Sequence, residues 1–468
     1  METMASSVSS PAARTLNSGV VLAVVLVSYF MIVLDNSIVF TGLARIREDL
    51  EFTTSGLSWV QNAYALVFGG LLLLAARIGD IVGRRRMFVI GLAIFAVASL
   101  LIGVAPTAEW MITARAIQGV GSAILAPTSL ALLTANFPEG PQRTRAIAAY
   151  GSTAGVGASL GLVAGGVLAD LTSWRVGFLI NVPIGLVLVI ATLIWIGETG
   201  RIRGRFDVLG AVSSTLGMTA LVYGITRTAD EGWTDAVAIA SVVLGLLVLG
   251  LFVLIESRAA QPILPLRVLA SRMRGGAFAS RMLFAGAIFG YFFFISQYMQ
   301  SVLGFSPLQA GIAFLPMTVV QFALSLSVPR LTRRFGNAAL VTVGLAVTFA
   351  GMVWLSFIGT DSSYWTAVAL PMLLLGAGQG LGFAPLTAAG VTDVETGDAG
   401  AASGAVNVAH QLGGALGVSV MVAIAAAAAP SEQVAAEASA GIATGAVLLG
   451  LALLSAFTLV IPGSRPRR

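Results

Sequence analysis

The chain has 468 residues, of which 57% are hydrophobic and only 10% are charged, and its formal net charge is +5. A soluble domain carries about 25% charged residues, so this composition leaves too little polar surface for a water-soluble fold. The chain has no Cys, no Lys and one His, which excludes disulfides, thiolate metal sites, P-loops and two-His zinc motifs. Its long apolar runs predict an all-α polytopic membrane protein.

Fourteen segments reach the length of about 20 mostly apolar residues that a membrane span requires. Six lie in the first part of the chain, two in the middle and six in the last part. In chain order, the expected spans are Ser18 to Phe40, Ser55 to Ala76, Met87 to Ala105, Trp110 to Leu133, Ala146 to Ala169, Val176 to Gly197, Val208 to Thr226, Ala236 to Ile255, Gly276 to Leu303, Pro307 to Val328, Ala338 to Ile358, Tyr364 to Thr387, Ala401 to Ala429 and Gly441 to Ile461.

The arginines support this count of spans. Arg is retained on the cytoplasmic side during insertion. With both termini inside, twenty of the 26 arginines lie in inner segments and four in outer segments, and only Arg115 and Arg281 fall within spans. The positive charge therefore indicates the topology of the chain in a membrane, with contacts to anionic lipid as a further option, and does not indicate nucleic-acid binding.

Short matching segments recur in the two halves of the chain. Gln118-Gly119-Val120-Gly121 in the fourth span matches Gln379-Gly380-Leu381-Gly382 in the twelfth, and the segment after span 2 resembles the one after span 10. Such repeats are typical of transporters built from two similar halves. We therefore expect a tail (1–17), a six-helix bundle (18–200), two inserted helices (201–258), a second six-helix bundle (259–461) and a basic tail (462–468).

Asp35 is the only acidic residue well inside a predicted span, about 26 Å along the helix that starts at Ser18. A carboxylate in a low-dielectric environment can gain and lose a proton near neutral pH, so Asp35 is a candidate for proton coupling and, with Asn36, for substrate binding. Arg115 keeps its charge, and can tune the proton affinity of Asp35 or bind a substrate anion. Two structural alternatives stay open: an ion pair of Asp35 with an intramembrane Arg, or an Arg115 that only holds backbone carbonyls.

Further polar side chains in the spans are candidates for function. His410 can relay protons, although a His packed by hydrogen bonds is the alternative. Arg281 lies about six residues into its span, close enough to the inner surface to snorkel there. The remaining candidates for substrate binding, or alternatively for hydrogen bonds between helices, are Gln118, Gln297, Tyr298 and Gln300.

Two glycine-containing segments suggest moving parts. The segment after span 2 is expected to be a loop in which a carboxylate and a basic cluster form a charge lock that holds one conformation. Its candidate gate residues are Arg77, Gly79, Asp80, Gly83, Arg84 and Arg85. In span 5, small residues at spacings of four predict a close helix contact, either a static one or a moving interface. These residues are Gly157, Gly161, Gly165 and Gly166.

Together these segments resemble the major facilitator superfamily, specifically its fourteen-span drug:proton antiporter branch. The resemblance covers nearly the whole chain. It rests on Leu34-Asp35, on the Arg77 to Arg86 segment, on Arg115 with Gln118-Gly119, and on Trp174-Arg175 with the Phe178 to Gly185 segment. Leu162 stands where the span 5 antiporter motif has Pro, and Phe40 and Arg45 stand where the family usually has Asn and Pro.

The resemblance implies a multidrug efflux transporter, without cofactor, metal or enzymatic activity, that works as a monomer. It would export a small amphiphilic substrate, with a cation as one option, by alternating-access antiport against protons. A first alternative is a dedicated self-resistance exporter of one endogenous natural product, since exclusive use of Arg indicates a GC-rich coding sequence. A second, from another class, is a non-transporting membrane sensor or lipid-handling scaffold.

Overall fold

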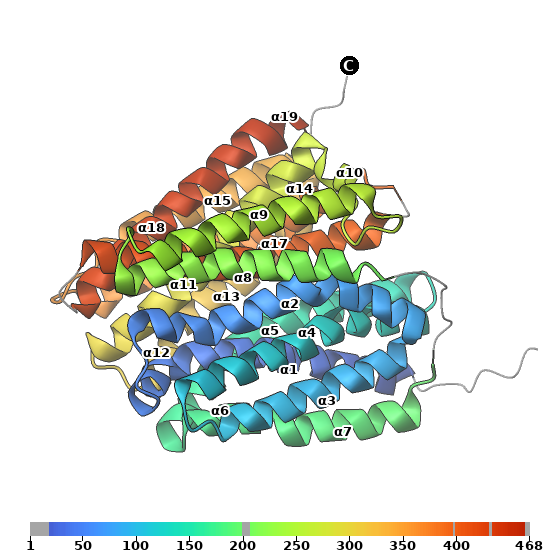
Figure 1. The fold of residues 1–468 in the computed structure, drawn as a ribbon, viewed down its shortest axis with the longest axis horizontal. Helices are drawn as coiled ribbons and strands as arrows, with labels where there is room; N and C mark the ends of the chain where they lie inside the picture. Colours follow the sequence, from blue (N-terminus) through green and yellow to red (C-terminus); the bar gives the residue numbers. More distant parts are fainter. Residues whose placement is uncertain (1–17, 199–205, 396–397, 430–432, 464–468) are drawn as a thin grey trace, which may run out of the picture.

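The computed structural model describes residues 18–198, 206–395, 398–429 and 433–463. Within these ranges the regular structure is helical, and fourteen helices or broken helices are long and apolar enough to cross a membrane. They lie side by side in one bundle (Figure 1). This confirms the expected all-α fold class. The predicted tail 1–17, most of the basic tail 462–468 and Arg201, Arg203 and Arg205 lie outside the described residues.

The helices follow one another with short connections. In chain order they are α1 (Ser18–Asp49), α2 (Thr54–Val82), α3 (Arg84–Gly103), α4 (Ala108–Asn136), α5 (Pro141–Leu171), α6 (Trp174–Leu179), α7 (Asn181–Trp195), α8 (Val208–Glu231), α9 (Ala236–Arg258), α10 (Leu266–Leu269), α11 (Arg272–Ser301), α12 (Pro307–Ala313), α13 (Leu315–Ser325), α14 (Val328–Phe335), α15 (Asn337–Leu355), the π-helix η1 (Tyr364–Ala369), α16 (Leu370–Val391), α17 (Ala399–Ala428), α18 (Val434–Ser455), the π-helix η3 (Ala456–Val460) and α19 (Ile461–Gly463).

Two spans are interrupted next to prolines. The sixth breaks at Ile180, three residues before Pro183, and the tenth breaks at Phe314, two residues before Pro316. Proline has no N–H group to donate to the carbonyl four residues earlier, so the regular helix ends near it. The tenth expected span, Pro307 to Val328, is confirmed as Pro307–Ser325, with this break inside it.

The segment expected as a loop after span 2 is helical. α2 continues to Val82 and α3 begins at Arg84, with only Gly83 between them. Gly83 has a φ of +123°, a conformation that side-chain-bearing residues rarely adopt. The turn is therefore the single residue Gly83, and the other five candidate gate residues lie on the two helix ends beside it.

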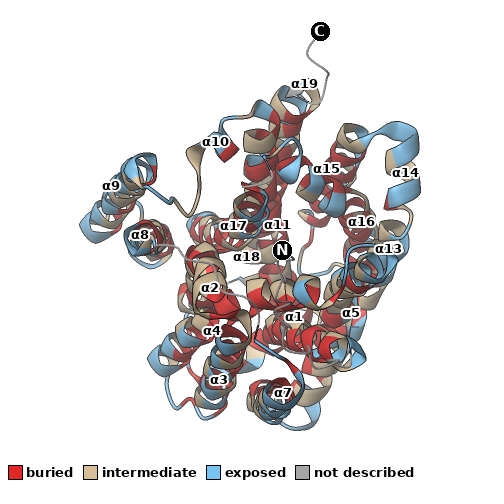
Figure 2. Ribbon diagram, turned by 90° about the vertical axis from the view of Figure 1, so that its right-hand side faces the viewer, coloured by how far each residue is buried: buried red, intermediate tan, exposed pale blue. Residues whose placement is uncertain are grey.

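The bundle consists of two six-span halves and an inserted pair. The first half comprises α1 to α7 and the second comprises α11 to η3, while α8 and α9 pack against each other. α8 also packs against α2 of the first half and α17 of the second, and Figure 2 shows α9 at the periphery with much of its surface exposed. The inserted pair thus lies at the junction of the two halves.

The two halves repeat one close helix contact. A Cβ atom on Gly119 of α4 would lie 2.7 Å from the carbonyl oxygen of Tyr64 in α2, and one on Gly380 of α16 would lie 2.5 Å from the carbonyl oxygen of Gln321 in α13. Only glycine allows so close an approach to a neighbouring backbone. The repeated Gln-Gly pair therefore marks equivalent positions in the two halves.

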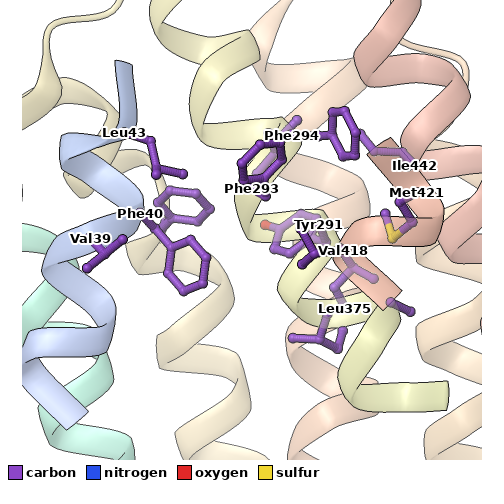
Figure 3. Close-up of a cluster of buried hydrophobic side chains, with 14 of the residues drawn as sticks. Val39, Phe40, Leu43, Tyr291, Phe293, Phe294, Leu375, Val418, Met421 and Ile442 are labelled. Atoms are coloured by element: carbon purple, nitrogen blue, oxygen red, sulfur yellow. The ribbon is translucent and has the colours of Figure 1, made fainter. Parts of the chain in front are cut away.

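The halves meet in an apolar cluster near one end of the bundle. We call the end where α1 begins at Ser18 the terminal end, and the end where α1 finishes at Asp49 the far end. Toward the far end, Phe40 of α1 is buried and its ring stacks on that of Phe292, with centroids 5.1 Å apart. Figure 3 shows Val39, Phe40 and Leu43 of α1 facing the aromatic side chains of α11. This cluster joins the halves at the far end.

Few hydrogen bonds accompany this apolar contact. The Ser296 hydroxyl donates to the Phe40 carbonyl at 2.6 Å, and the Gln300 amide donates to the Thr41 carbonyl at 3.3 Å. Nearer the terminal end, aromatic side chains on facing helices are less covered: Phe322 of α13 is 40% exposed and Phe383 of α16 is 39% exposed. The contact between the halves is therefore tighter at the far end.

Candidate functional site

Asp35 lies at the meeting point of three helices of the first half and is fully buried. Its Oδ2 atom accepts a hydrogen bond from Arg115 of α4 at 2.7 Å. Its Oδ1 atom accepts from Gln118 of α4 and from Asn181 of α7, both at 2.9 Å. Each carboxylate oxygen thus has a donor, as a buried charge requires.

Arg115 is also fully buried, and it contacts more than the carboxylate. Its Nε atom donates to the Val60 carbonyl at 2.9 Å, and Nη1 donates to Gln118 Oε1 at 2.5 Å. The guanidinium lies 4.3 Å from the ring centroid of Tyr64, within the range of a cation–π interaction. Arg115 and Asp35 form a buried ion pair, and its contacts come from α1, α2, α4 and α7.

Asn36 belongs to an adjoining network and has no hydrogen bond to Asp35 in the described structure. Its Nδ2 atom donates to the Tyr64 hydroxyl at 3.3 Å, and its Oδ1 atom accepts from Gln61 at 3.2 Å. The Tyr64 hydroxyl donates to Ser122 at 2.8 Å. Tyr64 therefore connects this network to Arg115, through its hydroxyl on one side and its ring on the other.

The structure does not bring the α11 candidates to Asp35. Gln297 donates to the Phe293 carbonyl at 3.0 Å, and the Tyr298 hydroxyl donates to the Gly359 carbonyl at 2.6 Å. Gln300 crosses to the first half but reaches the backbone of Thr41. All three side chains lie toward the far end of α11 and bond to backbone carbonyls.

His410 and Arg281 lie in the second half, apart from the ion pair. The His410 ring packs edge-on against Phe289 and Phe383, with centroids 5.2 and 5.8 Å away. Arg281 is 3% exposed, and its guanidinium carbon lies 3.6 Å from the Phe383 ring centroid. Because α11 begins at Arg272, Arg281 is nine residues inside the helix and is buried. The expectation that it snorkels to the surface is wrong.

The gate residues form contacts at the terminal end of the first half. Arg84 of α3 donates to Asp80 of α2 at 2.8 Å across the Gly83 turn, and Arg77 donates to Gln261 at 2.9 Å. The backbone N–H groups of Arg85 and Arg86 donate to the two carboxylate oxygens of Glu198, at 3.0 and 3.3 Å. A carboxylate at a helix N-terminus is favourable because it accepts from unpaired N–H groups.

The span 5 glycines lie against α1 and α12. A Cβ atom at Gly161 would lie 3.0 Å from the Leu34 carbonyl oxygen, and one at Gly165 would lie 2.7 Å from the Ile38 Cα atom. Gly157, one turn earlier, faces Val33. A Cβ atom at Gly166 would lie 2.5 Å from the carbonyl oxygen of Pro307 in the second half. The glycine-bearing segment of α5 therefore packs closely against α1 of its own half and against α12 of the other half.

Sequence analysis assigned no role to Asn181, Tyr64 or Glu198. Asn181 lies in a segment quoted for the family resemblance, and its position on the first turn of α7 directs its amide to Asp35. Neither Tyr64 nor Glu198 belongs to a motif that the sequence makes recognisable. Within the described ranges, no three carboxylate or imidazole side chains converge as metal ligands do.

Two six-span halves that repeat a helix contact around a buried ion pair define a membrane transporter of the repeat-built class. A sequence profile of the Major Facilitator Superfamily matches residues 25–418. The chain belongs to the major facilitator superfamily, and it groups with the drug and antibiotic efflux members of that family.

Three curated relatives illustrate the grouping. The chain is 36% identical to the cephamycin export protein of Amycolatopsis lactamdurans, over 88% of this chain and 86% of the relative. It is 36% identical to the puromycin resistance protein of Streptomyces alboniger, over 86% and 80%. It is 32% identical to the multidrug resistance protein Stp of Mycobacterium tuberculosis, over 84% and 73%.

Solved structures share the fold at low sequence identity. A bacterial homologue of the human lysosomal transporter Spinster, in an inward-facing and unoccupied conformation, superposes with a TM-score of 0.70 at 14% identity, over 96% of this chain and 99% of that one. A POT family transporter in complex with 5-aminolevulinic acid gives a TM-score of 0.70 at 11% identity, over 96% of each chain. These structures establish the fold alone.

Proposed function

We propose that the protein exports amphiphilic drugs or toxic metabolites across the bacterial cell membrane in exchange for protons, with both termini in the cytoplasm. The observation that carries this proposal is the Asp35–Arg115 ion pair, which is fully buried and held by donors from two helices. The relatives add support, because their names describe the export of cephamycin, resistance to puromycin and multidrug resistance.

In this proposal a proton and Arg115 compete for Asp35. Protonation removes the negative charge, so the hydrogen bonds from Arg115, Gln118 and Asn181 lose their ionic partner. Arg115 then keeps an uncompensated charge in a low-dielectric site, and α1, α4 and α7 rearrange to give it new partners. Since α1 also holds the apolar contact at the far end through Phe40, this rearrangement is coupled to opening between the halves.

A growth assay and a vesicle assay test the proposal together. In a bacterium lacking its own efflux pumps, the wild-type chain raises tolerance to at least one of puromycin, cephamycin, lincomycin or ethidium. In membrane vesicles with an imposed pH gradient, the proton gradient drives transport of the accepted compound, and Asp35→Asn abolishes this transport while the protein remains folded. Full gradient-driven transport by Asp35→Asn would exclude the coupling role of this residue.

A dedicated exporter of one natural product is the second candidate. It is favoured by relatives that are each named for one antibiotic, including the lincomycin resistance protein of Streptomyces lincolnensis, 32% identical over 88% of this chain and 85% of that protein. Tolerance to a single compound of the panel favours this candidate, and tolerance to several unrelated compounds favours multidrug export. Tolerance to none would favour a sensor or scaffold role.

A further inference from the structure

Arg281 is a buried cation, and no carboxylate of the described residues lies beside it. Its side chain lies against the Phe383 ring, and its one hydrogen bond in the described structure is a long one, 3.4 Å to the Phe383 carbonyl. Its Nε atom is buried without a partner. No carboxylate among the described residues forms an ion pair with Arg281, whereas Arg115 in the first half has Asp35 at 2.7 Å.

A buried positive charge is energetically unfavourable unless an anion or hydrogen-bond acceptors lie next to it. Arg does not release its proton inside a protein. Burial of an ion without a counter-charge carries a penalty of several kcal/mol per ion. The protein keeps this unfavourable group deep in α11, nine residues from the start of the helix at Arg272. An anion that arrives from outside the chain would relieve the penalty and would bind there preferentially.

The surroundings of Arg281 suit the body of an amphiphile. Phe383 and Phe289 pack around His410, and the buried Nδ1 atom of His410 has no partner. With its proton on this nitrogen, the imidazole can donate a second hydrogen bond to an anion. Phe383 remains 39% exposed although Arg281 and His410 lie against it. The cluster therefore borders space that a ligand can reach.

The first half contributes to the same region. Tyr29 of α1 stacks on Tyr150 of α5 with ring centroids 4.1 Å apart, and Arg281 is close enough to Tyr29 for the two side chains to interact electrostatically. Tyr29 precedes Asp35 by six residues, or about 9 Å of helix. The region is thus shared by the halves and lies on the terminal side of the buried ion pair.

We propose that Arg281, with His410, binds the oxyanion of the transported compound, while Phe289, Phe383 and Tyr29 hold its aromatic or apolar body. The substrate class is an amphiphile that carries a carboxylate. This inference rests on the proposed transport function and names its substrate class. It also assigns substrate recognition to a site separate from Asp35. Asp35 then binds the proton and not the substrate.

Equilibrium binding to the purified full-length protein in phosphatidylcholine nanodiscs tests the site without any pH gradient. The probes are 2-naphthoxyacetate and its primary amide, which have the same shape and differ in charge. Wild type prefers the carboxylate by about tenfold or more, as expected for a hydrogen-bonded charge pair. Arg281→Gln removes the preference, Arg281→Lys retains part of it, and Arg272→Gln, which changes an exposed arginine of the same helix, leaves it intact.

Three results would overturn the proposal. Wild type binds neither probe or binds both equally, or Arg281→Gln keeps the preference for the carboxylate. If Arg281→Gln does not fold, Arg281→Lys and His410→Leu decide, because each must weaken the preference. In nanodiscs that also contain phosphatidylglycerol, loss of the carboxylate preference in wild type would assign the site to a lipid head group. Binding requires neither export nor a gradient. A failed transport assay therefore does not change the result of the binding assay, and the two proposals can fail separately.

Discussion

Each half of this protein buries an arginine, but only the arginine of the first half has a carboxylate as its partner among the described residues. In the first half, Arg115 has a carboxylate, a carbonyl and an amide oxygen as partners, and neither Arg115 nor Asp35 is exposed. In the second half, Arg281 has a long hydrogen bond to one carbonyl and an aromatic ring. Removal of one partner from a buried ion pair is strongly destabilising, whereas removal of a buried charge that has no counter-ion relieves a desolvation penalty. Changes at Arg115, Gln118 and Arg281 test this difference, and an ion pair outside the spans provides a comparison.

The largest effect is expected for Arg115→Met, which leaves Asp35 buried without its counter-ion. We expect a loss of about 3–5 kcal/mol in the free energy of unfolding, measured by thermal unfolding in detergent with intrinsic fluorescence. The double variant Arg115→Met with Asp35→Asn removes both charges and should recover most of the loss. Equal stability of Arg115→Met and wild type would show that the pair is not compensated as its geometry indicates.

Gln118→Leu should have an intermediate effect. The side chain donates to Asp35 and to Ser99 and accepts from Arg115, so we expect a loss of about 1–3 kcal/mol. The matched control is Gln379→Leu at the equivalent position of the second half. Among the described residues, the Gln379 amide has only the Met317 sulfur as a partner, at 3.9 Å. Its replacement should therefore change stability by about 0.5 kcal/mol or less. Similar losses at both positions would contradict the difference between the halves.

Arg281→Met should act in the opposite direction to Arg115→Met. Because it removes a charge that lacks a counter-ion, we expect equal stability or a gain of about 1 kcal/mol. The same unfolding measurement checks it, with Arg272→Met as the control for loss of an exposed charge on the same helix. A loss as large as that of Arg115→Met would mean that Arg281 already has a strong partner within the protein.

The smallest effect concerns an ion pair outside the spans. Arg267 donates to both carboxylate oxygens of Asp398, at 2.5 and 2.9 Å, and these hydrogen bonds lower the pKa of Asp398. The pair therefore stabilises the folded state fully at pH 7, and this contribution is lost as the pH falls below about 4, the value for an unfolded aspartate. The difference in melting temperature between wild type and Asp398→Asn should shrink over that range. A constant difference would show that the pair does not titrate.

The fold was largely predictable because its signals are local. Apolar runs of span length and the placement of Arg identified all fourteen spans, since both depend on composition within a segment. The loop expected after span 2 was wrong, because Gly83 alone makes the turn between two helices. The break of the tenth span at Phe314 lies two residues before Pro316 and is not visible in the length of an apolar run.

The charged pair in the spans could be singled out from the sequence, but the arrangement around it could not. Asp35 and Arg115 are conspicuous because charges within spans are rare, but their pairing depends on how α1 and α4 are rotated. The amide of Asn181 reaches Asp35 from a helix 146 positions away in the chain, and no pattern signals this contact. Likewise, nothing in the order Gln297, Tyr298, Gln300 shows that Gln297 bonds within its own helix while Tyr298 and Gln300 bond to carbonyls of other segments.

The aromatic contact around Phe40 has a consequence for how the protein responds to temperature. Separation of the halves around Phe40 exposes stacked rings and breaks the hydrogen bonds from Ser296 and Gln300 to the backbone of α1. Exposure of apolar surface to water raises the heat capacity, so the enthalpy of this opening increases with temperature. Plots of the logarithm of transport rate against reciprocal temperature should therefore curve wherever this opening limits the cycle.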